Sequence, residues 1–434
     1  MRAKMRFQLN ALALAFLGCG LGTIQLSAGD WPQYRGPNHN GTSPEKILKS
    51  WPADGPRELW KVPLTDGFSA ISIADGKAFT LVTRSVEGAD QEVCVAMNAE
   101  TGKELWAMPL GIAKYDGGGD SGVPGNGGGD GPRSTPAYDE GKVYTYSSKM
   151  VLTCFNAADG KVLWSSDLIK DHGGRNIHWE SAASPLVEDG LVFIACGGKG
   201  ESLLAFDKQD GHVVWQGEDD GMTQSTPIAT TILGERQVIF FTQTGLVSVV
   251  PKSGKILWRY AFPYKTATAI SPVVSGDIVY CSSSYGVGAS ACKIAKTGDG
   301  FSATQLWFKP FKDINNHWST PVCADGYLYG LFGQAKYGKA PLECVELATG
   351  DVKWSKDGFG PGGCTLVDGH ILILSDAGDL VLVKVDKDEY KEVTRAHVLA
   401  GKCWNPASLS NGRIYARSTK EGVCLDLAPQ RASR

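Results

Sequence analysis

The feature that most constrains the fold is an eleven-residue segment that recurs along the chain and ends each time in tryptophan. In every copy a glycine stands four residues before that tryptophan, inside a polar turn flanked by short alternating segments. Glycine adopts the positive φ that tight hairpins need and interrupts helices, so each copy predicts a β-hairpin. The five copies are Ala96-Met-Asn-Ala-Glu-Thr-Gly-Lys-Glu-Leu-Trp106, Cys154-Phe-Asn-Ala-Ala-Asp-Gly-Lys-Val-Leu-Trp164, Ala205-Phe-Asp-Lys-Gln-Asp-Gly-His-Val-Val-Trp215, Ser248-Val-Val-Pro-Lys-Ser-Gly-Lys-Ile-Leu-Trp258 and Cys344-Val-Glu-Leu-Ala-Thr-Gly-Asp-Val-Lys-Trp354.

A second element precedes each hairpin: a Ser/Thr-Pro or similar small start, a few residues, then Asp-Gly or its equivalent and an apolar strand. Four strands in each repeat of about 45 residues are typical of a β-propeller blade. We therefore predict an all-β, eight-bladed β-propeller with four antiparallel strands per blade. The eight starts lie near Ser69, Ser134, Ala183, Ser225, Ser271, Ser319, Cys364 and Asn405.

The two ends of the chain are expected to close the ring together. Three strands are predicted around Ser408, Ile414 and residues 423–427, and the chain then ends without a fourth. The segment Arg57-Glu-Leu-Trp-Lys-Val62 precedes the first blade without a partner, so we expect it to complete the last blade as its outer strand and cover the sheet edge. We expect a signal peptide at 1–28, an N-terminal extension at 29–55, the propeller at 56–428 and a tail at 429–434.

The first residues indicate export. A basic start is followed by an apolar run centred on residues 11–17 and by small and polar residues up to Ala28, which is typical of a secretory signal peptide. Cleavage after Ala28 is one interpretation, and lipidation of Cys19 in Phe16-Leu17-Gly18-Cys19 is the other. No later run is long and apolar enough to predict a membrane span. We expect a protein of the periplasm or cell envelope, soluble or lipid-anchored at Cys19.

Charge and cysteine content exclude several function classes. The formal net charge of -3 gives no field that would attract nucleic acid. The 11 cysteines include no CxxC or CxxCH pattern, which argues against zinc, c-type haem and thioredoxin chemistry. A hairpin centred on Gly286-Val287 would place Cys281 and Cys292 opposite one another. Either they form a cross-strand disulfide or they are small buried hydrophobic residues.

The pattern Ala-x-Asp-x-x-Thr-Gly-x-x-x-Trp resembles the tryptophan-docking repeat of pyrroloquinoline quinone (PQQ) propellers. The segment Asp30-Trp-Pro-Gln-Tyr-Arg-Gly-Pro-Asn38 also resembles the N-terminal segment of many secreted PQQ-like repeat proteins. The resemblance covers nearly all of the chain after Asp30. It implies that the terminal tryptophans pack against the adjoining blade and hold blades together, which gives Trp106, Trp164, Trp215, Trp258 and Trp354 a structural role.

Two families share this repeat: quinoprotein dehydrogenases, which bind PQQ and calcium, and BamB-like outer-membrane assembly lipoproteins, which bind other proteins and no cofactor. The dehydrogenases carry a disulfide between adjacent cysteines, and this sequence has no Cys-Cys pair. We predict an exported, non-catalytic, monomeric propeller that binds a protein, peptide or small ligand in the cell envelope, as BamB does, without a cofactor. The alternative is a PQQ- and calcium-dependent alcohol or sugar dehydrogenase, and a third interpretation is a small-sugar or alcohol binder at Trp318 and Trp404.

The loops from an outer strand to the next inner strand should bring their last residues to the axis. Aromatic, amide and charged groups gather there, which indicates either a ligand pocket or a solvated polar funnel. The two His-Trp dipeptides are either an aromatic wall with a hydrogen-bonding imidazole or strand starts packed on a neighbour. The predicted channel-mouth residues are Arg133, His178, Trp179, Glu180, Gln224, Lys265, Asn315, Asn316, His317, Trp318, Trp404 and Asn405.

The longest insertion, residues 115–132, contains nine glycines together with Asp116, Asp120, Asn126 and Asp130. Its oxygen groups are suited to calcium, but the ordered spacing of a calcium loop is absent, so a surface loop is expected. We expect no metal site.

Overall fold

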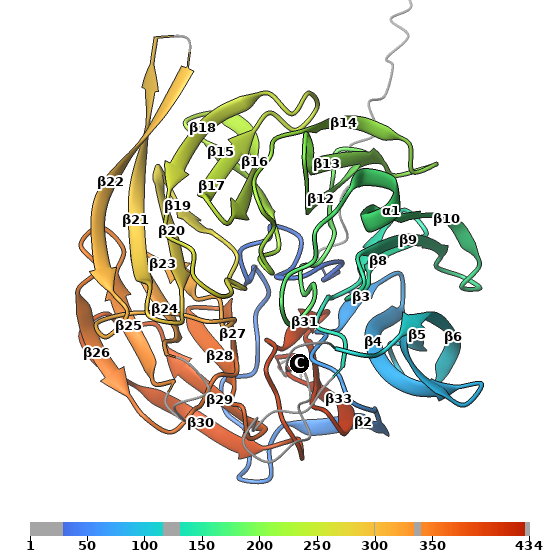
Figure 1. Ribbon diagram of the computed structural model, residues 1–434. Helices are drawn as coiled ribbons and strands as arrows, with labels where there is room; N and C mark the ends of the chain where they lie inside the picture. The colour runs from blue at the N-terminus through green and yellow to red at the C-terminus, as the bar shows by residue number, and fades with distance from the viewer. Residues whose placement is uncertain (1–28, 116–130, 299, 334–339, 430–434) are drawn as a thin grey trace, which may run out of the picture.

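The protein is a ring of eight antiparallel sheets around a central axis (Figure 1). The computed structural model describes residues 29–115, 131–298, 300–333 and 340–429. Within these residues the only α-helix is α1 (Leu168–His172). The predicted eight-bladed propeller is confirmed. The predicted signal peptide with Cys19, the oxygen groups of the glycine-rich insertion and tail residues 430–434 lie outside the described residues.

Blades 1 to 4 follow the chain, each with its first strand innermost and its fourth outermost. Their strands are β3 (Ser72–Ala74), β4 (Lys77–Val86), β5 (Ala89–Asn98) and β6 (Glu104–Ile112); β7 (Ala137–Asp139), β8 (Lys142–Tyr146), β9 (Val151–Asn156) and β10 (Val162–Asp167); β11 (Leu186–Glu188), β12 (Leu191–Gly198), β13 (Glu201–Asp207) and β14 (Val213–Gly217); and β15 (Ile228–Ile232), β16 (Glu235–Thr242), β17 (Gly245–Val249) and β18 (Ile256–Ala261).

Blades 5 to 8 continue the ring, and the predicted closure is observed in blade 8. Its outer strand β2 (Arg57–Pro63) pairs antiparallel with β33 (Glu421–Asp426). The other strands are β19 (Val273–Ser275), β20 (Ile278–Ser283), β21 (Gly288–Thr297) and β22 (Gly300–Pro310); β23 (Val322–Ala324), β24 (Tyr327–Leu331), β25 (Leu342–Glu346) and β26 (Val352–Lys356); β27 (Gly363–Val367), β28 (His370–Leu374), β29 (Asp379–Lys384) and β30 (Glu392–His397); and β31 (Ser408–Ser410) and β32 (Arg413–Arg417).

The repeated tryptophan of one blade lies on the repeated glycine of the next. The indole Nε1 of Trp164 donates to the carbonyl of Lys208 at 3.3 Å, and a Cβ added to Gly211 would meet that indole at 2.5 Å. Gly211 also has a φ of +75°, so the turn needs glycine for both space and conformation. The same bond to the next blade runs from Trp60 to Ala99, Trp106 to Ala157, Trp215 to Pro251, Trp307 to Leu347 and Trp354 to Asp386.

Two seams lack this bond, and the turn of blade 7 that receives Trp354 carries no glycine. Trp258 was expected to dock in the same way, but its Nε1 donates to Gln237 in its own blade at 2.6 Å. The physical reason lies in blade 5, where β21 and β22 extend to the register pair Thr297 and Gly300, so the short turn that receives a tryptophan elsewhere is absent. Blade 7 has Thr394 at the position of the tryptophan, and the N-terminal extension adds the buried Trp51 to the same apolar cluster as Ala396.

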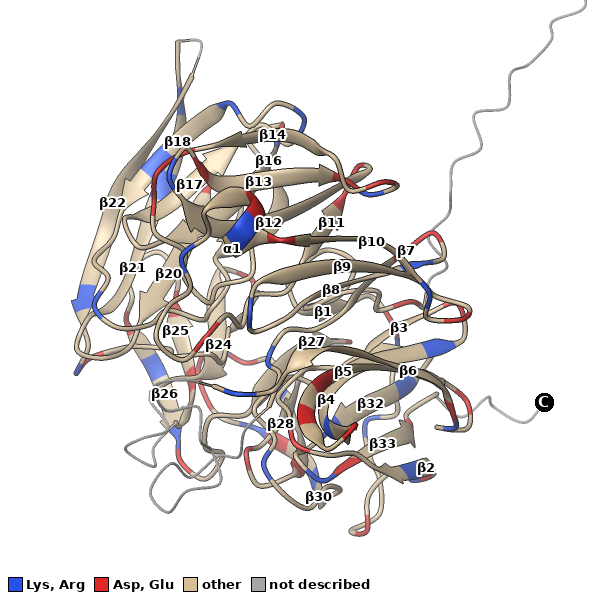
Figure 2. Cartoon of the chain, turned by 45° about the vertical axis from the view of Figure 1, so that its right-hand side comes forward, with Lys and Arg blue, Asp and Glu red and all other residues tan. Residues whose placement is uncertain are grey.

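The blade topology divides the loops between two faces of the ring. Each inner strand runs away from one face, so the loops between blades and the turns between second and third strands lie on that face. We call it the mouth face. The remaining turns, including the glycine turns, lie on the opposite face. Basic and acidic residues are interspersed over the blades in Figure 2, in keeping with the formal net charge of -3.

Residues 30–43, which we call the plug, cross the axis at the end opposite the mouth face (Figure 1, blue). Within the plug Arg35 is 2% exposed and donates to the carbonyls of Thr320 at 2.9 Å and Pro321 at 2.8 Å. The short strand β1 (Thr42–Ser43) pairs parallel with β27. The plug therefore closes this end of the axis. Its other contacts with the blades join Trp31 to Ile73, Pro32 to Tyr138, Gln33 to Val187, His39 to Ala229 and Gly41 to Leu366.

The cysteines settle the alternatives left by the sequence. All ten described cysteines are free thiols. Cys281 lies opposite Ser290 and Cys292 opposite Val279, so the predicted facing pair is wrong by two residues. The reason is the turn: Ser283 pairs with Gly288, which centres the hairpin earlier than expected. Both cysteines are fully buried and serve as small hydrophobic residues.

Candidate functional site

The channel-mouth residues lie on the loops between blades, with Trp179 at their centre. Trp179 and Glu180 have φ values of +75° and +64°, a conformation that bulky residues avoid. Such backbone costs about 1–3 kcal/mol per residue and persists only where surrounding contacts hold it. Two hydrogen bonds supply such contacts. Arg133 Nη1 donates to the carbonyl of Trp179 at 2.6 Å, and Gln224 Nε2 donates to the carbonyl of Glu180 at 2.8 Å.

The carboxylate of Glu180 adds a further support. It is 7% exposed and accepts from Lys149 Nζ at 2.8 Å and from the amide of Asn176. The ion pair and the amide bond together compensate its burial. Residues of the three loops that join blades 1 to 4, together with Lys149 of the β8–β9 turn, therefore hold the Trp179 loop in one conformation.

Six aromatic rings form a continuous arc across the mouth face. Tyr285 joins Trp179 to His317, with centroid distances of 5.3 and 4.9 Å, and its hydroxyl hydrogen-bonds His317 Nε2 at 2.7 Å. His317 contacts Trp318 at 4.5 Å, and Trp318 contacts Trp404 at 4.4 Å. Trp404 stacks on Phe68 at 4.5 Å. We call Trp179, Tyr285, His317, Trp318, Trp404 and Phe68 the aromatic arc.

Three polar atoms beside the arc are buried and have no hydrogen-bond partner: His317 Nδ1, Trp404 Nε1 and Asn405 Oδ1. The amide nitrogen of Asn405 donates to Phe68 at 3.4 Å, so only the oxygen of that amide is unsatisfied. Burial lowers the pKa of His317 to about 4, so its imidazole is neutral at pH 7. The arc therefore carries neutral groups that can accept or donate hydrogen bonds.

The structure separates the remaining predicted residues. Asn315 is 9% exposed, and its amide nitrogen donates to the Phe311 carbonyl at 3.0 Å. His178 is exposed, 5.3 Å from the Trp179 ring, and Lys265 is exposed with its Nζ beside Gly286. Asn316 does not reach the surface, because it is fully buried with its amide engaged by Tyr280 and Leu331. Its side chain lies in the seam between blades 5 and 6, and its role as a ligand-binding residue stays a prediction.

Sequence reasoning missed Tyr285 and Phe68. Tyr285 lies in the turn between β20 and β21, and turns between second and third strands also lie on the mouth face. Phe68 precedes the inner strand of blade 1, next to the recognised start at Ser69. Comparing each start with its preceding residue would have found Phe68, whereas Tyr285 required the fold.

An open hollow of about 780 Å³ lies on the same face, lined by the loop between blades 3 and 4 and by residues of blade 4. Glu218 and Asp220 line it and both bind Arg259, with the Asp220 contact at 2.9 Å. Asp219 lines it as well and accepts from the backbone of Gly200 at 2.6 Å. The hollow is thus acidic, with three carboxylates and one guanidinium.

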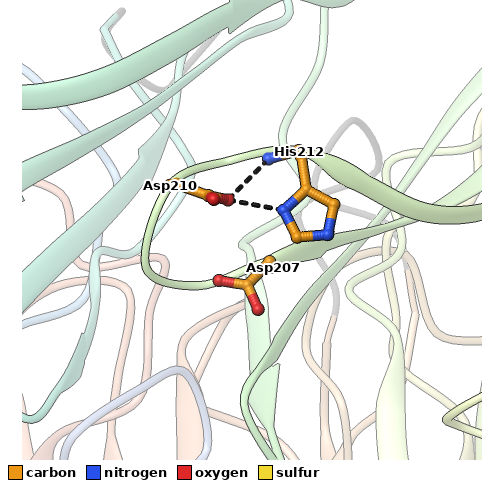
Figure 3. A group of neighbouring side chains, drawn as sticks. All are labelled: Asp207, Asp210 and His212. Carbon is orange, nitrogen blue, oxygen red and sulfur yellow. Dashed lines mark hydrogen bonds and ion pairs between the residues drawn. The ribbon is translucent and has the colours of Figure 1, made fainter.

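Asp207, Asp210 and His212 cluster in the glycine turn of blade 3, on the face opposite the mouth (Figure 3). Asp210 Oδ1 accepts from the backbone and Nδ1 of His212, and Asp207 Oδ1 accepts from the backbone of Gln209. Asn156 and Asp159 make the same bonds in the matching turn of blade 2. The cluster is explained by turn chemistry and does not indicate a metal site.

Comparison with known proteins identifies the family of the chain. The profile of the family described as "Outer membrane protein assembly factor BamB" matches residues 89–356, more than half of the chain. Curated relatives of that name match from Yersinia pestis, at 23% identity over 255 residues, 55% of this chain and 59% of that protein, and from Moranella endobia (strain PCIT), at 25% over 303 residues, 66% and 58%. The chain spans about three fifths of the length of these relatives.

Solved structures show the same fold. BamB from Moraxella catarrhalis superposes with a TM-score of 0.59 at 13% identity, over 87% of this chain and 99% of that one. Quinohemoprotein alcohol dehydrogenase from Comamonas testosteroni superposes with a TM-score of 0.62 at 15% identity, over 93% and 82%. At such low sequence identity the superpositions show a shared fold and not a shared activity. The family match confirms the resemblance given by the repeat, and the chain belongs to the Outer membrane protein assembly factor BamB family.

Proposed function

We propose that this protein is an exported, non-catalytic propeller that binds a protein or peptide partner with its mouth face and takes part in outer-membrane protein assembly, as BamB does. The observation that carries the proposal is the aromatic arc. Trp179, Tyr285, Trp318 and Trp404 are only half-buried, and large aromatic side chains are the usual anchors of protein interfaces.

The support around the arc favours binding over flexibility. Arg133 and Gln224 fix the carbonyls of Trp179 and Glu180 before any partner arrives. A pre-ordered surface loses less conformational entropy on association, so more of the contact energy appears as affinity. We propose that the protein binds its partner as a monomer and without a cofactor.

We propose export to the periplasm, with either a cleaved signal peptide or a lipid on Cys19. Among the described residues no helix is long and apolar enough to cross a membrane. Mass spectrometry of the mature N-terminus distinguishes Gly29 from acylated Cys19.

Site-specific photo-crosslinking in the producing cells tests the partner. A photoreactive residue replaces His178, which is exposed beside Trp179, and the control replaces Asp210, which is exposed on the opposite face. We expect crosslinks from position 178 to proteins of outer-membrane assembly, and their loss on Trp179→Ala. Equal labelling from both positions, or none from position 178, would contradict the proposal.

The alternative, a PQQ- and calcium-dependent dehydrogenase, shares the fold of a solved neighbour. Calcium requires several oxygen ligands, and PQQ carries carboxylates that need cationic partners. Among the described mouth residues Glu180 is engaged by Lys149 and Asn176, and Arg133 binds the Trp179 carbonyl. This donor set does not match such a cofactor. A calorimetric titration with PQQ and calcium, followed by a dye-linked alcohol oxidation assay, gives no heat and no turnover under our proposal.

A further inference from the structure

Glu92 of blade 1 is a buried acid in a row of apolar residues. It lies on β5, on the same side of the strand as Cys94 and Ala96, which belong to the apolar cluster between blades 1 and 2. The residue is 1% exposed. A carboxylate is retained in such a place only where partners compensate its lost hydration.

Two hydrogen bonds and one nearby charge compensate the burial of Glu92. Its Oε1 accepts from the hydroxyl of Tyr115 at 2.7 Å, and its Oε2 accepts from the backbone N–H of Ser148 at 3.0 Å. Burial raises the pKa of Glu92, whereas these two bonds and the charge of Arg133 lower it. All three partners favour the carboxylate over the neutral acid. Each oxygen of Glu92 therefore holds a different segment of the chain.

The first segment leads from Tyr115 to the backbone of Trp179. The ring of Tyr115 is buried and lies 5.3 Å, at its centroid, from the guanidinium carbon of Arg133. A cation in this position is attracted to the ring. Arg133 in turn donates to the carbonyl of Trp179 at 2.6 Å. The bond from the Tyr115 hydroxyl to Glu92 thus orients the ring that the guanidinium of Arg133 contacts.

The second segment is the β8–β9 turn, which contacts the same loop at two points. The carbonyl of Ser148 accepts from Asn176 Nδ2 at 2.8 Å, and Lys149 Nζ donates to Glu180 Oε1 at 2.8 Å. Because Glu92 accepts from the N–H of Ser148, it fixes the turn that makes both contacts.

Both sets of contacts end at the two residues of the loop with positive φ, Trp179 and Glu180. Such backbone persists only where its surroundings hold it. A glutamine at position 92 would have a single acceptor oxygen, so it would keep at most one of the two bonds and direct its NH₂ group at the other donor. The position therefore requires an acid.

We propose that Glu92 is a positioning residue of the mouth face, which holds Trp179 in its binding conformation through Tyr115 and Arg133 and through the β8–β9 turn. Glu92 lies on blade 1, whereas the loop that it holds joins blades 2 and 3. The inference rests on the proposed function, since Trp179 belongs to the aromatic arc that contacts the partner in that proposal.

Hydrogen exchange measured by mass spectrometry on the purified mature protein tests the positioning without a partner. Peptides that cover residues 176–181 report on the loop, and peptides that cover β16 report on a buried strand. We expect Glu92→Gln and Tyr115→Phe each to raise exchange in the loop about tenfold and to leave exchange in β16 native. Tyr144→Phe is the matched control, because it removes another buried hydroxyl bond, to the carbonyl of Lys208, and should leave the loop native.

The same variants are then compared by photo-crosslinking from position 178. If Glu92 holds the binding conformation, its loss lowers the fraction of protein that is competent to bind, so the yield should fall at least about threefold in Glu92→Gln and stay native in Tyr144→Phe. Where Glu92→Gln lowers the melting temperature, Tyr115→Phe decides, since it removes only a hydroxyl group.

Native loop exchange in Glu92→Gln and Tyr115→Phe would overturn the inference. An equal rise of exchange in the loop and in β16 would overturn it too, because it would show a purely structural role, as would a native crosslinking yield in a variant whose loop exchange is raised. Absence of crosslinks in the native protein, with raised loop exchange in the variants, would reject the protein partner alone and support the positioning of Trp179.

Discussion

At the scale of the residue, the glycine of the repeat has two structural roles: it allows its own turn to form, and it leaves space for the tryptophan of the preceding blade. In the five docking turns that carry it, its φ is positive and an added Cβ would touch the preceding tryptophan; these glycines are Gly102, Gly160, Gly211, Gly254 and Gly350. The positive φ can be predicted from the sequence alone. The lack of space for a Cβ depends on the tryptophan of the neighbouring blade, and it explains why glycine and tryptophan recur together.

Gly211→Ala tests this double requirement, because Gly211 has a φ of +75° and a new Cβ would meet Trp164 at 2.5 Å. Gly190→Ala is the matched control, since Gly190 has a φ of +85° and open space around it. Left-handed strain costs the control about 1–2 kcal/mol. Overpacking should add about 1–3 kcal/mol at Gly211. Urea unfolding measures both, and equal losses would show that the indole contact is unimportant.

Two buried histidines should make stability depend on pH. Burial lowers the pKa of His39 and of His317 to about 4, below the ordinary value of about 6.5. Between these values the unfolded chain binds protons that the folded protein excludes, so the free energy of unfolding falls as pH drops from about 6.5 to about 4. Urea titrations across this range should show the fall, and His39→Gln with His317→Gln should flatten it. An unchanged slope in the double variant would contradict the assignment.

At the scale of the element, the eight blade starts and the closing strand could be predicted because each depends on local pattern and count. The facing of Cys281 and Cys292 could not, since register depends on where a turn closes, and a shift of turn centre by one residue moves cross-strand partners by two. The hydrogen bond of Trp258 could not be predicted for a tertiary reason: the turn that would receive it in blade 5 is replaced by a long hairpin.

The residues of the mouth face also fall into those that the sequence could predict and those that it could not. The loops between blades carry most of it, and their residues could be found from the repeat. Tyr285 links Trp179 to His317 from a different turn, and Asn316 is turned into the seam by Tyr280 and Leu331. Neither orientation follows from sequence position, because both are decided by packing between blades.

The closing strand β2 leads to a further testable prediction. Trp60 is 7% exposed and donates to Ala99 of blade 1, so Trp60→Ala should remove a buried contact between the last blade and the first. We expect a loss of about 3–5 kcal/mol, as for other buried aromatic truncations. Lys61→Ala, on the same strand, should change stability by less than about 1 kcal/mol. Equal losses in thermal unfolding would mean that the strand, and not its tryptophan, holds the seam.

At the scale of the whole molecule, the plug gives the two faces of the ring different roles. Gly29, the first residue that the structure describes, lies beside Asn411 at the closed end, and the aromatic arc lies at the other. A large fusion placed before Gly29 should therefore leave partner binding unchanged.

A polymer on the mouth face should have the opposite effect. His178→Cys offers an exposed thiol, whereas burial raises the pKa of native thiols such as Cys94 and Cys281 and makes them unreactive. Labelling of His178→Cys with a maleimide polymer should abolish binding of the protein partner found by crosslinking, as measured by calorimetry. Loss of binding in the N-terminal fusion as well would show that access is not restricted to the mouth.

The pairing of β2 with β33 also sets the timing of folding. Arg57 lies opposite Asp426, so a strand made at the start of synthesis waits for one made at the end. Until the last blade has been synthesised, the ring stays open at two sheet edges and is prone to aggregation. A chain of this design completes its fold only after both ends of the propeller have been made.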